Sequence, residues 1–203
     1  MIINIRGTSG SGKTHTARSF LDHYSPNLEI MDSSGKLVAH AVSYKTLPVY
    51  LIGSYRNICG GCDAVPDQDT VCGLVRHFSQ FGHVIFEGLL ISHLYARYKA
   101  LYDELFGKFN IPFVYAYMDT PLELCIERVK SRRLAKGNSK PFNPENTISH
   151  YHATWKTYEK FRQDGVETIK IHHLYDPLEQ IEGLLGRDPY MDFENSYVEE
   201  SFR

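Results

Sequence analysis

The sequence lacks long apolar runs and has few cysteines. No stretch of roughly 18 apolar residues occurs, so we expect no transmembrane helix. Four cysteines in 203 residues do not make a disulfide framework. The first residues run directly into a glycine-rich motif and do not resemble a signal peptide. A reducing cytoplasm is therefore the expected compartment.

An excess of charge of either sign is also absent. The chain has 22 Lys and Arg against 24 Asp and Glu, a formal net charge of −2. This balance disfavours a protein that coats nucleic acid through general basicity. With 42% hydrophobic and 23% charged residues, the composition excludes disorder and collagen-like repeats. We expect one domain over residues 1–186 and an acidic, aromatic tail over residues 187–203.

Short apolar runs alternate with helical patterns along the chain, which is typical of an α/β fold. Ile2–Arg6 is predicted to be a buried strand, with a helix starting at Lys13. Residues 27–55 contain three β-like pieces, the first two joined by a predicted turn at residues 32–35. This region is expected to be a β-hairpin inserted into the α/β chain. One long helix is expected over residues 92–106.

A complete phosphate-binding motif, G-x-x-x-x-G-K-[ST], follows the first strand and opens the first helix. Its residues are Gly7, Thr8, Ser9, Gly10, Ser11, Gly12, Lys13 and Thr14. Glycines permit a turn whose N–H groups point at phosphate oxygens, and the helix N-terminus adds a positive dipole. Lys13 would neutralise the β- and γ-phosphates, and the Thr14 hydroxyl would hold Mg²⁺. A chance glycine-rich turn is disfavoured because strand, loop and helix occur in the required order.

Other signals narrow the class of nucleotide-binding protein. No guanine-reading N-K-x-D motif is present, which disfavours a GTPase, and a motor or AAA-type ATPase would need more chain. The remaining class is a small phosphotransferase with a three-layer P-loop NTPase fold. It would have a parallel sheet, the hairpin insertion at about 27–55 and a basic lid at about 133–144. ATP and Mg²⁺ are its expected cofactors.

A carboxylate, Glu87, ends the predicted strand around residues 83–86 and precedes Gly88. Ligands of open α/β sheets bind at the carboxyl ends of strands. Glu87 could hold a water on Mg²⁺ or act on the acceptor. The alternative is a carboxylate that only caps a strand-to-helix turn.

The segment from Tyr55 to Asp63 contains a second candidate carboxylate. Gly60 and Gly61 permit positive φ angles beside a ligand. Asp63 is then a candidate general base, and Tyr55 or Arg56 a candidate acceptor contact. A tight loop without a catalytic role is the equally weighted alternative.

Cys59 and Cys62 in the same segment have the spacing of half a zinc site. No second Cys or His pair with convincing spacing completes it, so a structural zinc ion is disfavoured. Thiols that pack inside the loop are the simpler interpretation.

A run of cations follows the predicted strand at residues 113–118. Arg128 and Arg132 are four residues apart and therefore share one helix face, with Arg133 beside them. Six cations and no acid occur between Arg128 and Lys140. A solvated helix face is the usual explanation for such a run. We expect instead a lid that clamps phosphates, in which Arg128 and Arg132 spread transition-state charge and Arg133 contacts substrate.

The phosphate-binding motif, the Glu87-Gly88 strand end and residues 119–133 together resemble the thymidylate-kinase-like P-loop kinases. More narrowly, residues 59–63, 82–90 and 140–147 resemble the 5-hydroxymethyldeoxyuridine DNA kinases of tailed bacteriophages. This resemblance implies ATP-dependent phosphorylation of the 5-hydroxymethyl group of 5-hydroxymethyluracil in phage DNA, a step in thymidine hypermodification. Thymidylate kinases carry an aspartate–arginine pair and a glycine–proline loop that this chain lacks, so thymidylate is disfavoured as the acceptor.

Two alternatives remain open from the sequence. One is a free nucleotide or nucleoside kinase of the same fold, and the other is a non-catalytic ATP-binding protein. The acidic tail and the basic run are well separated, so near-neutrality is compatible with a transient visit by one DNA strand or one base. The predicted catalytic residues are Lys13, Asp63, Glu87, Arg128 and Arg132.

Overall fold

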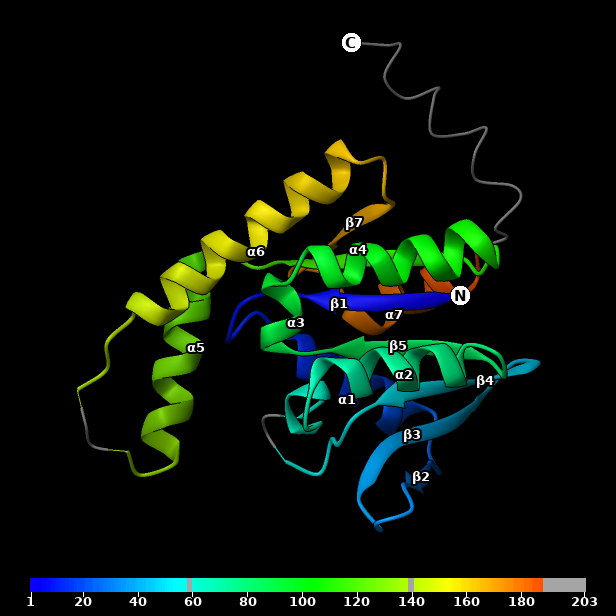
Figure 1. Ribbon diagram of the computed structural model, residues 1–203. Coiled ribbons are helices and arrows are strands. Elements are labelled where there is room, and N and C mark those ends of the chain that lie inside the picture. The colour runs from blue at the N-terminus through cyan, green and yellow to red at the C-terminus, as the bar shows by residue number, and fades with distance from the viewer. Residues whose placement is uncertain (58–59, 139–140, 188–203) are drawn as a thin grey trace.

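The computed structural model describes residues 1–57, 60–138 and 141–187, and it has a seven-stranded sheet in the order β2-β3-β4-β5-β1-β6-β7 (Figure 1). The strands are β1 (Ile2–Arg6), β2 (Leu28–Met31), β3 (Leu37–Tyr44), β4 (Leu47–Ile52), β5 (His83–Glu87), β6 (Phe113–Asp119) and β7 (Thr168–His172). The α-helices are α1 (Lys13–His23), α2 (Gln68–Phe78), α3 (Leu89–His93), α4 (Ala96–Tyr102), α5 (Leu122–Ala135), α6 (Glu145–Gln163) and α7 (Pro177–Leu185). The predicted α/β architecture is confirmed.

Five of the strands run parallel, and two more extend the sheet at one edge. β4, β5, β1, β6 and β7 pair in parallel, whereas β2, β3 and β4 form an antiparallel meander. The predicted hairpin is therefore present as β2 and β3, and it continues the main sheet through β4. The turn at its tip forms because the Asp32 carboxylate accepts hydrogen bonds from the amides of Ser34 (2.8 Å) and Lys36 (3.0 Å).

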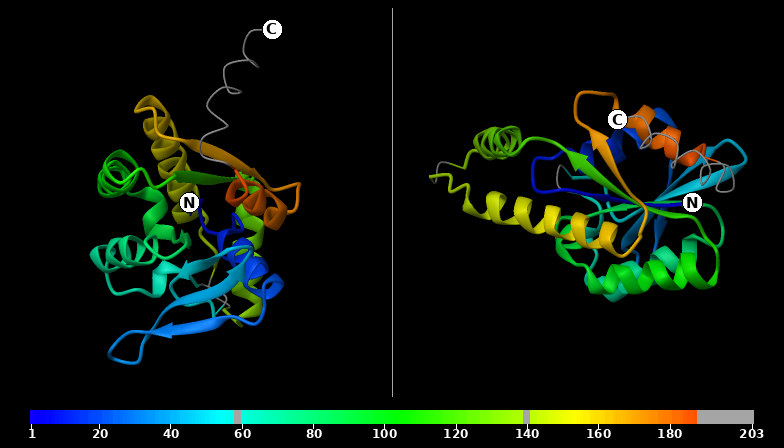
Figure 2. Two further views of the ribbon diagram at one scale, coloured as in Figure 1. Left: turned by 90° about the vertical axis from the view of Figure 1, so that its right-hand side faces the viewer. Right: turned by 90° about the horizontal axis from the view of Figure 1, so that it is seen from above.

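Helices cover both faces of the sheet, which gives three layers (Figure 2). Side chains alternate between the faces along each strand. In β6, Tyr115 and Tyr117 pack against residues from α2, α3, α4 and α6. Val114 and Ala116 point to the opposite face, where α1 and α7 pack. Both faces of the central strands are therefore buried, as parallel sheets require.

Arg6, the last residue of β1, is fully buried. Its guanidinium carbon lies 4.7 Å from the ring centre of Tyr115 and 4.8 Å from that of Phe161, which are cation–π distances. Its Nε donates to Asn4 Oδ1 (2.6 Å) and its Nη1 to the Leu94 carbonyl (3.2 Å). The Leu94 carbonyl is thus turned inward, with extended backbone at Leu94.

The expectation of one helix over residues 92–106 is wrong for that reason. The chain forms the short α3, breaks at Leu94, and then forms α4, which continues as a π-helical turn over Asp103–Lys108. α3 follows β5 directly in the sequence and therefore lies beside the strand end that carries Glu87.

Helices α5 and α6 project together beyond the body of the sheet (Figures 1 and 2). α5 continues to Ala135, two residues beyond the start predicted for the lid, and Gly137 then adopts φ 69°. Lys140, Cys59 and the predicted acidic tail from residue 188 lie outside the described residues. No helix in the described part of the chain is long and apolar enough to cross a membrane.

Candidate active site

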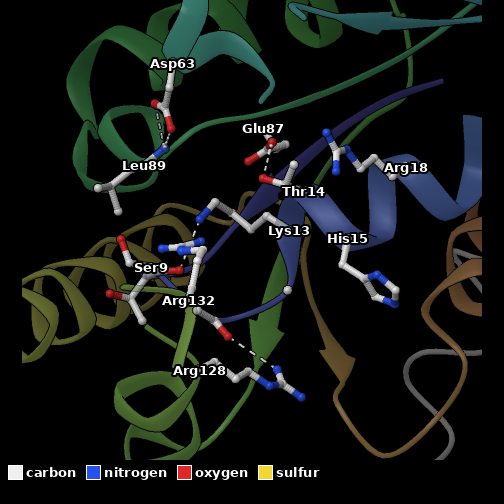
Figure 3. Close-up of a pocket in the computed structure, with 13 residues that line it drawn as sticks. Ser9, Lys13, Thr14, His15, Arg18, Asp63, Glu87, Leu89, Arg128 and Arg132 are labelled. Carbon is white, nitrogen blue, oxygen red and sulfur yellow. Dashed lines mark hydrogen bonds between the residues drawn. The ribbon is translucent and has the colours of Figure 1, made fainter. Parts of the chain in front are cut away.

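A cavity with a volume of about 620 Å³ opens at the carboxyl ends of β1 and β5 (Figure 3). Ile5 of β1 pairs with Glu87 of β5, so the loop that leaves β1 begins beside this carboxylate. The loop after β1, the end of β5 and the helices α1, α3 and α5 all contribute to the lining. The lining residues are Thr8, Ser9, Gly10, Gly12, Lys13, Thr14, His15, Arg18, Asp63, Glu87, Leu89, Arg128 and Arg132.

The loop between β1 and α1 depends on two left-handed glycines. Gly10 has φ 81°, and Gly12 has φ 107° at the N-terminus of α1. A Cβ atom on Gly10 would lie 2.4 Å from the Cys125 carbonyl oxygen of α5. Arg128 Nη1 also donates to the Gly10 carbonyl (3.3 Å). The loop is thus packed directly against α5, the helix that carries the two cavity-lining arginines.

The Lys13 side chain lies under this loop and is buried. Its Nζ donates to the carbonyls of Gly7 (2.8 Å) and Thr8 (3.1 Å). Burial lowers the pKa of the ammonium, while Glu87 and Asp63 oppose that shift. A desolvated cation held at the floor of the cavity is a strong partner for an anionic ligand.

Glu87 is 1% exposed, and its Oε1 accepts a hydrogen bond from the Thr14 hydroxyl (2.9 Å). Burial raises the pKa of this carboxyl to about 7, against the opposing effects of Lys13 and Thr14. A hydroxyl and a carboxylate are oxygen ligands of the kind that Mg²⁺ takes. No group of three or more His, Cys, Asp or Glu residues gathers in the described chain. Thr14 and Glu87 therefore fit an ion that also binds phosphates and waters, and not a site built from protein ligands alone.

Asp63 lies on the opposite wall, in a short 3₁₀ helix (η1, Cys62–Ala64). Both of its carboxylate oxygens accept the Leu89 amide proton at the start of α3, at 2.9 and 3.0 Å. The side chain is exposed to the cavity, unlike Glu87. The two carboxyl groups thus have different environments in one cavity.

Gly61 explains how η1 comes so close to β5. It has φ 72°, and a Cβ atom there would lie 2.4 Å from Glu87 Oε1. Only glycine fits between η1 and the Glu87 carboxylate.

Ten of the predicted site residues line this cavity, and seven do not. Gly7 and Ser11 belong to the loop but point away from the cavity; the Ser11 carbonyl accepts from the Thr120 hydroxyl (2.8 Å). Gly60 and Gly61 lie behind the cavity wall. The other three are Tyr55, Arg56 and Arg133.

Tyr55 and Arg56 line a second cavity of about 300 Å³ instead. Tyr55 is 5% exposed, and its hydroxyl donates to the Ile52 carbonyl (3.4 Å). Arg56 forms an ion pair with Glu29 of β2. Arg133 turns toward the Phe142 ring, 5.8 Å from its centre. Cys62 is buried in the core, and burial raises the pKa of its thiol.

Three lining residues were not predicted from the sequence: His15, Arg18 and Leu89. Arg18 follows Thr14 by four residues, so helical spacing alone puts both on one face of α1. That spacing is the signal by which Arg18 could have been found.

Known proteins similar in sequence to this chain include kinases of bacteriophages. No family model matches the sequence. A protein of Pseudomonas phage PaMx11 named 5-hmdU DNA kinase is 36% identical over 173 residues, which cover 83% of this chain and 89% of the relative. The chain belongs to the family of 5-hmdU DNA kinases.

A second phage relative carries the same name. A 5-hmdU DNA kinase of Pseudomonas phage M6 is 26% identical over 192 residues, covering 90% of this chain and 96% of the relative. Among solved structures, deoxyadenosine kinase from M. mycoides aligns over 91% of this chain and 97% of its own, with 13% identity and a TM-score of 0.47. This 5-hmdU DNA kinase family member is therefore a phosphotransferase that uses a nucleoside triphosphate.

Proposed function

We propose that the protein transfers the γ-phosphoryl group of ATP, with Mg²⁺, to the 5-hydroxymethyl group of 5-hydroxymethyluracil in DNA. The observation that carries the proposal is a single cavity in which a phosphate-binding loop faces two carboxylates and three arginines. The relatives named 5-hmdU DNA kinase support the choice of acceptor. Their phage origin supports action in the host cytoplasm.

In this proposal the loop amides and Lys13 bind the polyphosphate. Thr14 and Glu87 hold the magnesium ion, which neutralises phosphate charge when it is bound. Asp63 accepts the proton of the hydroxymethyl group as the hydroxymethyl oxygen forms a bond to the γ-phosphorus. The bond from the γ-phosphorus to the bridging oxygen breaks, and ADP leaves. Arg128 and Arg132 stabilise the charge that develops on the transferred group.

The different environments of the two carboxyl groups support this division of roles. Glu87 is enclosed between Thr14, Lys13 and Gly61, which suits a group that holds an ion in place. Asp63 is exposed to the cavity and anchored by the Leu89 amide, which suits a group that meets an incoming hydroxyl. In this proposal a base turned out of the DNA stack meets Asp63, and such flipping requires ~2–4 kcal/mol.

We further propose residues 1–186 as the working unit, with the connection between α5 and α6 as its lid. The cations Arg128 and Arg132 near its base support that assignment, since they already line the cavity.

The test is transfer of label from γ-labelled ATP to three acceptors: DNA that contains 5-hydroxymethyluracil, the same DNA with thymine, and free 5-hydroxymethyl-dUMP. We expect label on the first DNA alone. Label that appears only on the free nucleotide would overturn the DNA acceptor and support a free nucleotide kinase. Hydrolysis or binding of ATP without any transfer would support a non-catalytic protein.

A further inference from the structure

Arg18 joins the helix of the phosphate-binding loop to the backbone of residues 53–57. Its Nε and Nη2 donate to the Tyr55 carbonyl at 3.1 and 2.7 Å, and Nη2 also donates to the Asn57 carbonyl. Hydrogen bonds from a charged guanidinium are stronger than neutral ones. The planar fork of arginine can bridge two acceptors at once, which an ammonium group on lysine does less well.

The same side chain lies between the two cavities. Arg18 lines the main cavity together with Thr14 and Glu87, and it lines the second cavity together with Tyr55 and Arg56. In Figure 3 its side chain extends from α1 on the side where Thr14 and Glu87 meet. Arg18 therefore lies between the phosphate-binding loop and residues 53–57, the segment that leads along the chain to Asp63.

Residues 53–57 are in turn held against Gly61, the residue before η1, by close backbone contacts. These contacts join Gly53 and Ser54 to Gly61, and we call them the glycine neck. The Gly61 amide donates to the Ser54 carbonyl (2.8 Å), and a Cβ on Gly53 would lie 2.1 Å from the Gly61 carbonyl oxygen. Gly53 has φ 100°, a conformation that favours glycine. Gly61 also packs against the Glu87 carboxylate, and Asp63 follows Gly61 by two residues in the sequence.

A continuous path of contacts thus runs from Arg18 through residues 53–57 and the glycine neck to both carboxylates. We infer that Arg18 is a positioning residue for the acceptor: it fixes this segment so that Asp63 and Glu87 face the phosphate-binding loop. The inference rests on the proposed function for its kinetic part. Its structural part is measurable without any substrate.

The structural test is hydrogen exchange of the amides in residues 53–57 and 60–63 in the free protein. Arg18→Ala should speed their exchange by about tenfold or more, because charged hydrogen bonds to two carbonyls are lost. Arg18→Lys should restore only part of the protection. The matched control is Arg76→Ala, which removes a partly exposed arginine paired with Glu104, remote from both cavities. Unchanged exchange in Arg18→Ala would overturn the inference.

The kinetic test separates the two substrates. Arg18→Ala should lower kcat/KM for the acceptor on the order of 10²-fold while the KM for ATP stays within about twofold, since small misplacements of reacting groups are costly. An equal rise in both KM values would show that Arg18 binds the nucleotide and would overturn a positioning role.

Failure of the proposed function is distinguishable from failure of this inference. If wild-type protein does not phosphorylate hydroxymethyluracil DNA, the acceptor assignment fails, and the exchange experiment still decides whether Arg18 orders the segment. If wild-type protein is active and Arg18→Ala keeps normal acceptor kinetics, the positioning role alone fails.

Discussion

The Thr14 hydroxyl donates a hydrogen bond of 2.9 Å to Glu87 Oε1, although the two residues are 73 positions apart in the sequence. Parallel pairing of β1 with β5 makes the contact possible, because Ile5 lies beside Glu87 and the phosphate-binding loop starts two residues later. The loop proposed to bind phosphate and the strand end proposed to hold Mg²⁺ are therefore joined in one unit.

Protonation of Glu87 should govern the response to magnesium. With the pKa of its carboxyl raised to about 7 by burial, the free protein holds a neutral acid below that pH and a carboxylate above it. Protons and Mg²⁺ compete for the same oxygens, so apparent Mg²⁺ affinity should fall about tenfold per pH unit below pH 7 and level off above it. Titrating activity with Mg²⁺ at several pH values measures this. In Glu87→Gln the residual activity should lose the pH dependence; a profile that matches wild type would contradict the assignment.

Removal of the Lys13 ammonium should separate activity from stability. Lys13→Met keeps an apolar chain of similar length and removes a buried cation whose pKa is already lowered by desolvation. Phosphoryl transfer should fall by at least about 10²–10³-fold, as for the loss of one well-placed donor. The melting temperature, followed by circular dichroism, should stay within a few degrees, roughly 1 kcal/mol in free energy of unfolding. A collapsed spectrum would show that Lys13 is needed for folding instead.

A methyl group on Gly61 should displace Glu87. Gly61→Ala puts a Cβ atom 2.4 Å from Glu87 Oε1, at φ 72°. Gly35→Ala is the matched control, because Gly35 has φ 78° and nothing within 4 Å of the added atom. Gly35→Ala should lose roughly 1–2 kcal/mol of stability from its positive φ angle, and Gly61→Ala should lose more, because its Cβ atom also collides with Glu87. Only Gly61→Ala should also lose transfer activity, on the order of 10²-fold. Equal activity in the two variants would remove Gly61 from the site.

Two substitutions at Asp63 should distinguish a base from a helix cap. Asp63→Asn keeps a side-chain oxygen that can accept the Leu89 amide proton, whereas Asp63→Ala removes it. If Asp63 is the general base, both variants should lower kcat by about 10²–10⁴-fold. Only Asp63→Ala should lower thermal stability, by about 1 kcal/mol. Near-normal turnover in Asp63→Asn would show that Asp63 caps α3 and is not the general base.

The elements with local signals could be predicted from the sequence. The predicted first strand, Ile2–Arg6, has the bounds found in the structure, and α1 starts at Lys13 as predicted. The phosphate-binding loop is encoded by contiguous residues, so its position and conformation follow from the motif. Asp63, Glu87, Arg128 and Arg132 were predicted as candidates, and they line the same cavity as the loop. Their catalytic roles stay predictions.

Features that depend on distant contacts could not be predicted in this way. The break between α3 and α4 depends on Arg6, 88 residues before the carbonyl that it binds. The buried residues of α6 are Thr147, Thr154, Thr157, Tyr158 and Phe161, three of which are small and polar. Small threonines are favoured there because the Thr157 hydroxyl donates to the Ser92 carbonyl (3.1 Å) of α3. A hydrophobic pattern does not report such polar packing.

The strand order divides the sheet into two parts that contribute different residues to the cavity. One part, β2 to β5, leads through the glycine neck to the residues proposed to meet the acceptor; the other, β1, β6 and β7, carries the phosphate-binding loop and α5. The acceptor part comes from a nearly continuous stretch of chain, residues 28–93. A transplant of that stretch between relatives should exchange acceptor preference and would also carry Glu87 of β5, whereas the phosphate-binding loop and α5 would stay unchanged. We therefore expect the preference for an acceptor to follow residues 28–93 in such a transplant.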